Sequence, residues 1–305
     1  MRHETIYLRE GRTDVKLTTY IIDDSFEILN GRKRPAVIIC PGGGYWLTSD
    51  REGEPVALAF LRMGYHAFVL DYSVYGRDAL TMTPETMPVR EESLYPNAMC
   101  DLGAAVLMLK DHADEWLVDP DRIAVCGFSA GGHLCATYAT NWTKPVLSDY
   151  FNRPKGDFKV AACVLGYTVF DMLWNYEQNG SKDDMISIAL VGNNPSRKLL
   201  EEVSPNRNVD ENTPPMFIWA TSEDAIVPVQ HSMMMAIALA EKNIPFDLHI
   251  FEEGPHGTAL SDMTTAEACD MILPDAKKWC ALCDAWLQKR FFLPLPAKLG
   301  EPNQY

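Results

Sequence analysis

The chain has 305 residues, of which 47% are hydrophobic and 23% are charged, so it can form a full hydrophobic core. Its formal net charge of −15 excludes nucleic acid and anionic membrane surfaces as partners, because both would repel it. The N-terminus lacks the apolar run of a secretory signal, and no segment approaches the roughly 20 apolar residues that span a bilayer. We therefore expect a cytoplasmic protein without a membrane partner.

Apolar patterning along the chain alternates between strand-like and helix-like segments. Two short strands with period-2 character, expected at 5–10 and 16–22, form an antiparallel edge. The later strands are apolar runs typical of buried parallel strands, and they are expected at 34–40, 65–72, 122–127, 159–167, 216–222 and 245–254. Helices are expected at 55–64, 97–116, 132–140, 229–243 and 267–290, the last kinked near Pro274. This alternation predicts an α/β fold with a mostly parallel central sheet and helices on both faces.

Two polar stretches, 73–96 and 168–213, do not fit the core pattern and contain proline, asparagine and glycine. Active-site lids in α/β enzymes are often built from such loops, so we interpret both as cap or lid excursions. We expect them to belong to a single domain that spans residues 1–305. The tail, residues 291–305, is expected to be irregular.

The eight cysteines are interpreted as residues of a reduced compartment. Cys40, Cys126 and Cys163 lie in or at the end of apolar, strand-like runs, as small buried hydrophobic side chains do. Cys280 and Cys283 have the spacing of metal ligands, but they lie in a helical pattern without a second cysteine or histidine pair nearby. We predict no metal site.

A glycine-rich turn interrupts the strand-to-helix pattern at "RIAVCGFSAGGH", residues 122–133. Gly127 and Gly131 flank Ser129 in a Gly-x-Ser-x-Gly motif, which allows a very tight turn with the serine hydroxyl exposed above the sheet. The N-terminus of the following helix favours negative charge at the same place. The motif alone is weak, because glycines can also pack a βα turn for steric reasons. Its position between a strand and a helix favours a nucleophile at Ser129.

A serine hydroxyl needs a base, and one of the seven histidines stands out. His256 lies in a Gly-Pro-His-Gly loop that follows the last predicted strand and can reach over the sheet edge. His133 directly follows the turn and is expected to point away from the cleft. We predict His256 as the base.

The imidazole in turn needs a carboxylate to orient it. Asp224 follows a predicted strand and is preferred, with Glu223 and Asp171 as alternatives. A purely structural role for Asp224, capping the next helix or turn, is the competing interpretation. The chain order Ser129, Asp224, His256 is the order in which these roles occur on a parallel α/β sheet.

A second glycine-rich segment, "CPGGGYW" at 40–46, follows the first buried strand. It lacks the Lys-Ser/Thr of a phosphate-binding P-loop and the spaced glycines of a dinucleotide site. We expect the amides of Gly43 or Gly44, with that of Ala130, to form an oxyanion hole.

Aromatic side chains are candidates for substrate binding, because aromatic faces stack well on sugar rings. Tyr45 and Trp46 directly follow the glycines and are expected to line the substrate site. Tyr75, Trp174 and Tyr176 lie in the two excursions and are candidates for overhanging the cleft.

Together these segments resemble the α/β-hydrolase superfamily over nearly the whole chain. The blocks that carry the resemblance are "PGGGY" at 41–45, "LDYSV" at 70–74, "DPDRIAVCGFSAGGHLCA" at 119–136, "TPPMFIWATSEDAIVP" at 213–228 and "EEGPHGT" at 252–258. Pro41 stands where the hormone-sensitive-lipase-like branch has histidine. The chain is therefore more similar to the bacterial carbohydrate-esterase-like branch, which includes acetyl esterases, acetylxylan-esterase-like and feruloyl-esterase-like proteins.

The resemblance implies a serine esterase that uses an acyl-enzyme and needs no metal or organic cofactor. The expected substrate is a small-molecule or oligosaccharide ester, with acetyl on a sugar preferred. A peptidase of the prolyl-oligopeptidase type and a non-catalytic ligand-binding homologue are the alternatives. The sequence leaves open whether the chain forms a homo-oligomer.

Overall fold

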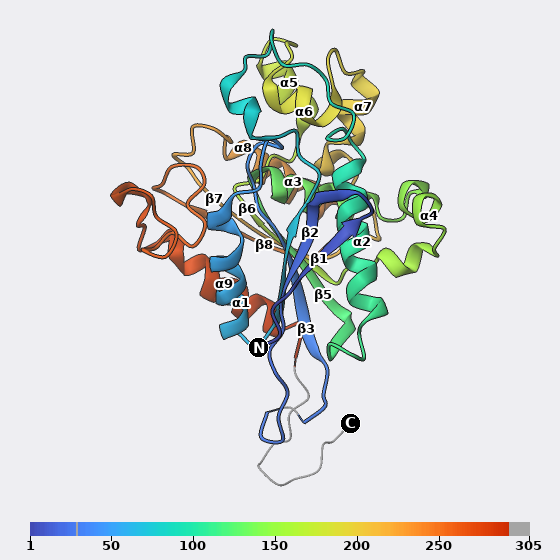
Figure 1. Ribbon diagram of the computed structural model, residues 1–305. Helices are drawn as coiled ribbons and strands as arrows, with labels where there is room; N and C mark the ends of the chain where they lie inside the picture. The colour runs from blue at the N-terminus through green and yellow to red at the C-terminus, as the bar shows by residue number, and fades with distance from the viewer. Residues whose placement is uncertain (29, 293–305) are drawn as a thin grey trace.

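An 8-stranded sheet forms the centre of the computed structural model, which describes residues 1–28 and 30–292 (Figure 1). Its strand order is β1-β2-β4-β3-β5-β6-β7-β8. The edge strand β1 pairs antiparallel with β2, and β2 pairs antiparallel with β4. All pairings from β4 to β8 are parallel, which confirms the predicted mostly parallel sheet. The strands are β1 Thr5–Arg9, β2 Arg12–Tyr20, β3 Arg34–Cys40, β4 His66–Asp71, β5 Val118–Phe128, β6 Ala162–Gly166, β7 Met216–Thr221 and β8 Phe246–Phe251.

Helices cover both faces of this sheet, with α1 and α9 on one side and α2 on the other (Figure 1). Side chains of β3 alternate between the two layers: Val37 and Ile39 pack with α1 and α9, whereas Ile38 and Cys40 pack with α2 and α3. The helices are α1 Glu54–Arg62, α2 Asn97–Asp111, α3 Ser129–Asn141, α4 Pro145–Phe151, α5 Met172–Gln178, α6 Met185–Val191, α7 Arg197–Glu202, α8 Gln230–Glu241 and α9 Trp279–Gln288. Within the described ranges, no helix has the length and apolar character needed to cross a membrane.

The final helix is much shorter than predicted. Instead of a kinked helix over 267–290, the chain forms loops and two short 3₁₀ turns before α9 begins at Trp279. Pro274 has no backbone N–H and disfavours helical geometry in the residue before it, so the apolar periodicity upstream does not become helix. The irregular tail predicted for 291–305 lies, from residue 293 onward, outside the described residues.

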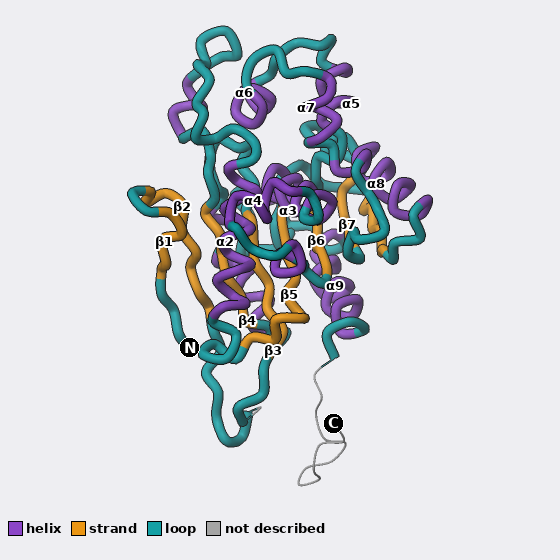
Figure 2. The backbone as a smooth tube through the Cα atoms, turned by 90° about the vertical axis from the view of Figure 1, so that its right-hand side faces the viewer, coloured by secondary structure: helices purple, strands orange, loops and turns teal. Residues whose placement is uncertain are grey.

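The two excursions meet beyond one end of the strands, as the views in Figures 1 and 2 show. The second contains the short helices α5, α6 and α7, and the first contains a 3₁₀ turn at Arg77–Thr81. Hydrogen bonds join them: the Ser93 hydroxyl donates to the carbonyl of Ala189 at 2.8 Å, and the Tyr95 amide donates to that of Leu190 at 2.7 Å. The two segments therefore form one cap.

Replacing Phe60 by alanine tests the layer formed by α1. The phenyl ring is fully buried between α1 and the sheet, so Phe60→Ala should lower the free energy of unfolding by about 3–5 kcal/mol. Leu58 on the same helix is 46% exposed, and Leu58→Ala should change it by less than about 0.5 kcal/mol. Urea denaturation of the two variants measures both values, and equal effects would contradict this packing.

Candidate active site

Four loops converge at the carboxyl ends of the parallel strands. They follow β3, β5, β7 and β8, and they bring the glycine-rich segment, Ser129, Asp224 and His256 to one edge of the sheet. Ligands of open α/β sheets bind at this edge, because loops from neighbouring strands meet there.

The turn at Ser129 has the strained geometry that its glycines imply. Ser129 has a φ of 50°, in the left-handed region, and is the first residue of α3. A Cβ on Gly127 would lie 2.3 Å from the carbonyl oxygen of Gly131, and one on Gly131 would lie 2.0 Å from that of Cys40. Close backbone packing therefore requires glycine at both positions, and the same turn leaves Ser129 only partly buried.

A hydrogen-bonded chain joins the three predicted side chains. His256 Nδ1 lies 2.7 Å from Asp224 Oδ2, and His256 Nε2 lies 2.9 Å from Ser129 Oγ. Because a carboxylate only accepts, Nδ1 carries the proton of the neutral imidazole, and Nε2 accepts the hydrogen bond from Ser129. The amides of Ile226 and Val227 donate to Asp224 Oδ1 at 2.9 and 2.8 Å, which holds the carboxylate in place. The chain can thus activate a hydroxyl as a nucleophile.

The alternative acids have other partners. Glu223 accepts a hydrogen bond from the Gly254 amide at 3.2 Å. Asp171 caps α5 by accepting from the Trp174 amide, and it forms an ion pair with Arg207 at 2.8 Å. The geometry therefore favours Asp224 over both.

The loop after β3 supplies free backbone donors beside Ser129. Gly43 and Gly44 have φ values of 129° and 63°, and their amides donate to no other group in the described part of the chain. Ala130 is the second residue of α3, where amides have no partner in a preceding turn. All three residues line the same cavity as Ser129 and His256.

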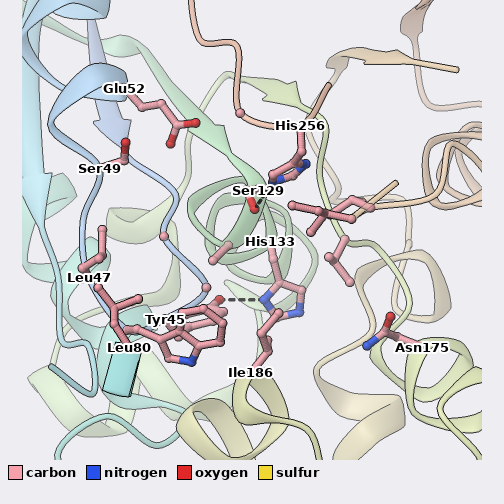
Figure 3. A pocket seen from close by; sticks show the side chains of 18 of the residues that line it. Tyr45, Leu47, Ser49, Glu52, Leu80, Ser129, His133, Asn175, Ile186 and His256 are labelled. Atoms are coloured by element: carbon pink, nitrogen blue, oxygen red, sulfur yellow. Dashed lines mark hydrogen bonds between the residues drawn. The ribbon is translucent and has the colours of Figure 1, made fainter. Parts of the chain in front are cut away.

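The cavity around these groups has a volume of about 370 Å³, and side chains from the core loops and from the cap line it (Figure 3). Most of its wall is apolar, formed by Trp46, Leu47, Leu80, Val169, Met172, Ile186, Ile226 and Val227. An apolar wall with a few polar groups at one place is the usual form of a small-molecule site.

Tyr45 and Trp46 both line this cavity, in line with their predicted location. The indole N–H of Trp46 donates to the carbonyl of Met185 at 3.2 Å and so connects the glycine-rich loop to α6 in the cap. The Tyr45 hydroxyl lies 2.6 Å from His133 Nδ1 (Figure 3).

The prediction that His133 points away from the cleft is wrong, because this residue lines the cavity. Helix α3 begins at Ser129 itself, so position 133 lies one turn further along the same helix face. Burial lowers the pKa of His133 to about 4, so its ring is neutral at pH 7. Its Nε2–H donates to the Val203 carbonyl at 2.7 Å, and Nδ1 therefore accepts from Tyr45.

The aromatic residues of the excursions pack elsewhere. Tyr75 is buried beneath the guanidinium of Arg90, whose centre lies 4.1 Å from the ring centroid, and Trp174 packs edge-on against His231. Four polar residues that sequence reasoning missed line the cavity instead, namely Ser49, Arg51, Glu52 and Asn175. They lie in polar stretches whose composition does not distinguish them from ordinary surface residues.

The described ranges contain no group of three or more histidine, cysteine, aspartate or glutamate side chains that could hold a metal ion. Cys280 and Cys283 lie in α9, and neither lines the cavity.

Residues 29–239 match the sequence pattern of the BD-FAE family, which covers well over half of the chain. The chain belongs to the BD-FAE family. The matched segment includes Ser129 and Asp224 and ends before His256.

Known proteins similar to this BD-FAE family member include one curated enzyme and two solved structures. Endo-1,4-beta-xylanase B of Butyrivibrio fibrisolvens is 34% identical over 236 residues, which are 75% of this chain but only 33% of that protein. The α/β hydrolase MGS-M1, from a Medee basin deep-sea metagenome, is 34% identical with a TM-score of 0.73, covering 96% of this chain and 99% of its own. The acetyl ester-xyloside bifunctional hydrolase of Caldicellulosiruptor lactoaceticus is 30% identical with a TM-score of 0.74, covering 94% and 96%. The predicted α/β-hydrolase fold is confirmed.

Three buried histidines make stability depend on pH. Burial lowers the pKa of His66, His133 and His231 to about 4, whereas the unfolded imidazole has a pKa near 6.5. The unfolded state therefore binds more protons between pH 6.5 and pH 4. The free energy of unfolding should fall as pH falls through this window, by about 1.4 kcal/mol per pH unit for each histidine.

Urea denaturation at pH 7, 6 and 5 measures this decrease. Proton NMR of the native imidazoles separates the three sites. Protonation of the His133 imidazole near pH 6.5 would contradict the lowered pKa of this residue.

Proposed function

We propose that this chain is a serine carboxylic-ester hydrolase that acts through an acyl-enzyme and removes short acyl groups, preferentially acetyl, from a sugar or oligosaccharide. The observation that carries the proposal is the hydrogen-bonded chain from Asp224 through His256 to Ser129, placed at an apolar cavity. In this proposal Ser129 is the nucleophile, His256 the general base and acid, and Asp224 the residue that orients the imidazole.

In the first step, Ser129 Oγ attacks the ester carbonyl carbon while His256 Nε2 accepts the hydroxyl proton. The carbonyl oxygen becomes an oxyanion, and the amides of Gly43 or Gly44 and of Ala130 donate hydrogen bonds to it. His256 then gives its proton to the leaving alcohol oxygen as the C–O bond breaks. Asp224 stabilises the imidazolium between these two transfers, and the acyl group stays bound to Ser129.

In the second step, water replaces the alcohol. His256 removes a proton from the water, the resulting nucleophile attacks the acyl carbonyl, and the same amides stabilise the second oxyanion. Collapse of this intermediate returns the proton to Ser129 Oγ and releases the acid. This cycle uses only side chains and amides of the chain itself, so the proposal includes no metal or organic cofactor.

The substrate assignment rests on the relatives. One is named as a xylanase and another as an acetyl ester-xyloside hydrolase, so both names refer to xylose-based sugars. Tyr45 and Trp46 on the cavity wall supply aromatic surface on which a sugar or acyl group could pack. The intact hydrogen-bonded chain disfavours the non-catalytic alternative, and no contact in the cavity favours a peptidase.

We also propose a cytoplasmic location. All eight cysteines are free, and six of them are buried in the core (Cys40, Cys100, Cys126, Cys135, Cys163 and Cys283). Buried thiols of this kind are typical of proteins from a reducing compartment.

Replacing the nucleophile is the direct test of the reaction. Ser129→Ala should lower kcat on p-nitrophenyl acetate by at least about a thousandfold, because no hydroxyl is left to attack the carbonyl. The variant should also lose its labelling by a fluorophosphonate probe. Ser148→Ala, on α4 outside the cavity, is the matched control and should keep full activity. Turnover retained by Ser129→Ala would remove the proposal.

A series of substrates tests the specificity. We expect kcat/KM to be highest for acetyl aryl esters, to fall for butyryl and octanoyl esters, and to be negligible for an aminoacyl p-nitroanilide. Acetylated xylo-oligosaccharides should release acetate, measured by enzymatic acetate assay. A preference for octanoyl esters would point to a lipase, and turnover of the anilide would point to the peptidase alternative.

A further inference from the structure

Glu52 is a buried carboxylate that lines the same cavity as the proposed catalytic residues but takes no part in the proposed reaction. Glu52 ends a short 3₁₀ turn, Asp50–Glu52, between the glycine-rich loop and α1. Its side chain lines the cavity, yet the residue is only 3% exposed (Figure 3). Burying a carboxylate is costly unless its oxygens are well paired, so its partners indicate what it does.

Hydrogen bonds connect Glu52 to both loops that carry the proposed machinery. The Gly42 amide, next to Gly43, donates to Glu52 Oε2 at 2.6 Å. The Tyr167 hydroxyl donates to Glu52 Oε1 at 2.7 Å and itself accepts from the Ala259 amide at 2.9 Å. Ala259 lies in the loop of His256, and the Tyr167 ring centroid lies 5.0 Å from that of His256. One carboxylate thus joins the oxyanion loop to the histidine loop.

The pattern of donors indicates that Glu52 is ionised. Because the Ala259 amide can only donate to the Tyr167 oxygen, the hydroxyl proton of Tyr167 points to Glu52. The Gly42 amide also can only donate, so both carboxylate oxygens are acceptors. Burial is the largest influence and raises the pKa of the Glu52 carboxyl overall, whereas the bonds from Tyr167 and Gly42 and the nearby His256 and Arg51 partly oppose this rise.

The charged and titratable groups around Glu52 are few. Arg51, the next residue in the chain, is held by the Gly257 carbonyl and by an ion pair with Glu267. Tyr72 and Cys126 also face this region, with Tyr72 donating to the Pro41 carbonyl. His256 is therefore the one group facing Glu52 whose charge changes in the proposed reaction.

We propose that Glu52 is a positioning residue that holds the oxyanion loop and the histidine loop in place and, as an anion, stabilises the imidazolium form of His256. This inference rests on the proposed function. Glu52 does not touch the reacting atoms. It acts through the Gly42 amide, through Tyr167 and through its charge.

Asp101 provides a matched comparison. It is also a fully buried carboxylate, held by an ion pair with Arg9 at 2.5 Å and by the Ser73 amide at 2.8 Å. It lies in α2 and does not line the cavity. A loss of buried charge at Asp101 should therefore affect stability without affecting the protonation of His256.

The test is the pH profile of kcat/KM on p-nitrophenyl acetate for wild type, Glu52→Gln and Asp101→Asn. Without the anion, His256 should lose its proton at lower pH. The midpoint of the acid limb in the kcat/KM profile of Glu52→Gln should therefore lie about half a pH unit or more below that of wild type. Its kcat should fall by about tenfold or more while KM stays within about twofold, because imidazolium and oxyanion stabilisation act in the transition state. Asp101→Asn should lower the melting temperature and leave the acid limb unchanged.

A second variant, Glu52→Asp, tests the position of the carboxylate separately from its charge. It also keeps the inference testable if Glu52→Gln does not fold. The shorter side chain keeps the charge but cannot reach both donors, so kcat should fall at least about threefold with the acid limb close to that of wild type. An unmoved acid limb in Glu52→Gln, or full kcat in Glu52→Asp, would overturn the inference. An inactive wild type would instead refute the proposed function, whereas active wild type with a fully active Glu52→Gln would refute the role of Glu52 alone.

Discussion

The close contact between two turns, one after β3 and one after β5, is the constraint on which the site depends. The parallel pairing of these strands places Cys40 opposite Gly127, so both chains leave the sheet side by side. At this point a Cβ on Gly131 would lie 2.0 Å from the Cys40 oxygen, and one on Gly42 would lie 2.9 Å from Ser129 Cβ. Only backbone without side chains allows this approach. The pairing of β3 with β5 therefore sets the spacing between the Ser129 hydroxyl and the free amides of Gly43 and Gly44.

The imidazole depends on contacts that are distant in sequence. His256 lies in a loop after the edge-most parallel strand, 127 residues from Ser129 along the chain. Asp224 holds Nδ1 from one side, and its own position is set by two backbone amides. Tyr167 packs edge-on against the ring and links the loop to Glu52. Asp224 thus bonds to the imidazole directly, whereas Glu52 reaches the histidine loop through Tyr167, and amide or hydroxyl donors hold both carboxylates.

The cap adds the outer wall of the cavity and reduces the access of water to the polar groups. Trp46 bonds to Met185 of α6, so the glycine-rich loop and the cap are joined at the wall of the cavity that Ser129 also lines. Leu80 and Ile186 come from the two excursions and close the wall beside it. In such apolar surroundings, hydrogen bonds and charges act more strongly than in water, which suits a reaction that creates an oxyanion and an imidazolium together.

The sequence by itself determined the alternating elements and the tight turn at Ser129, because buried parallel strands and a turn with left-handed geometry restrict residue type locally. It also indicated Asp224 and His256 as residues that meet Ser129, since both follow predicted strands at the edge where loops meet. It did not reveal Glu52, the cavity position of His133 or the late start of α9 at Trp279. Polar side chains in loops carry no periodic signal, and their roles depend on which donors the tertiary structure brings to them. Only the packing of the loops after β3, β6 and β8 decided that a carboxylate at position 52 would meet an amide and a tyrosine beside the imidazole.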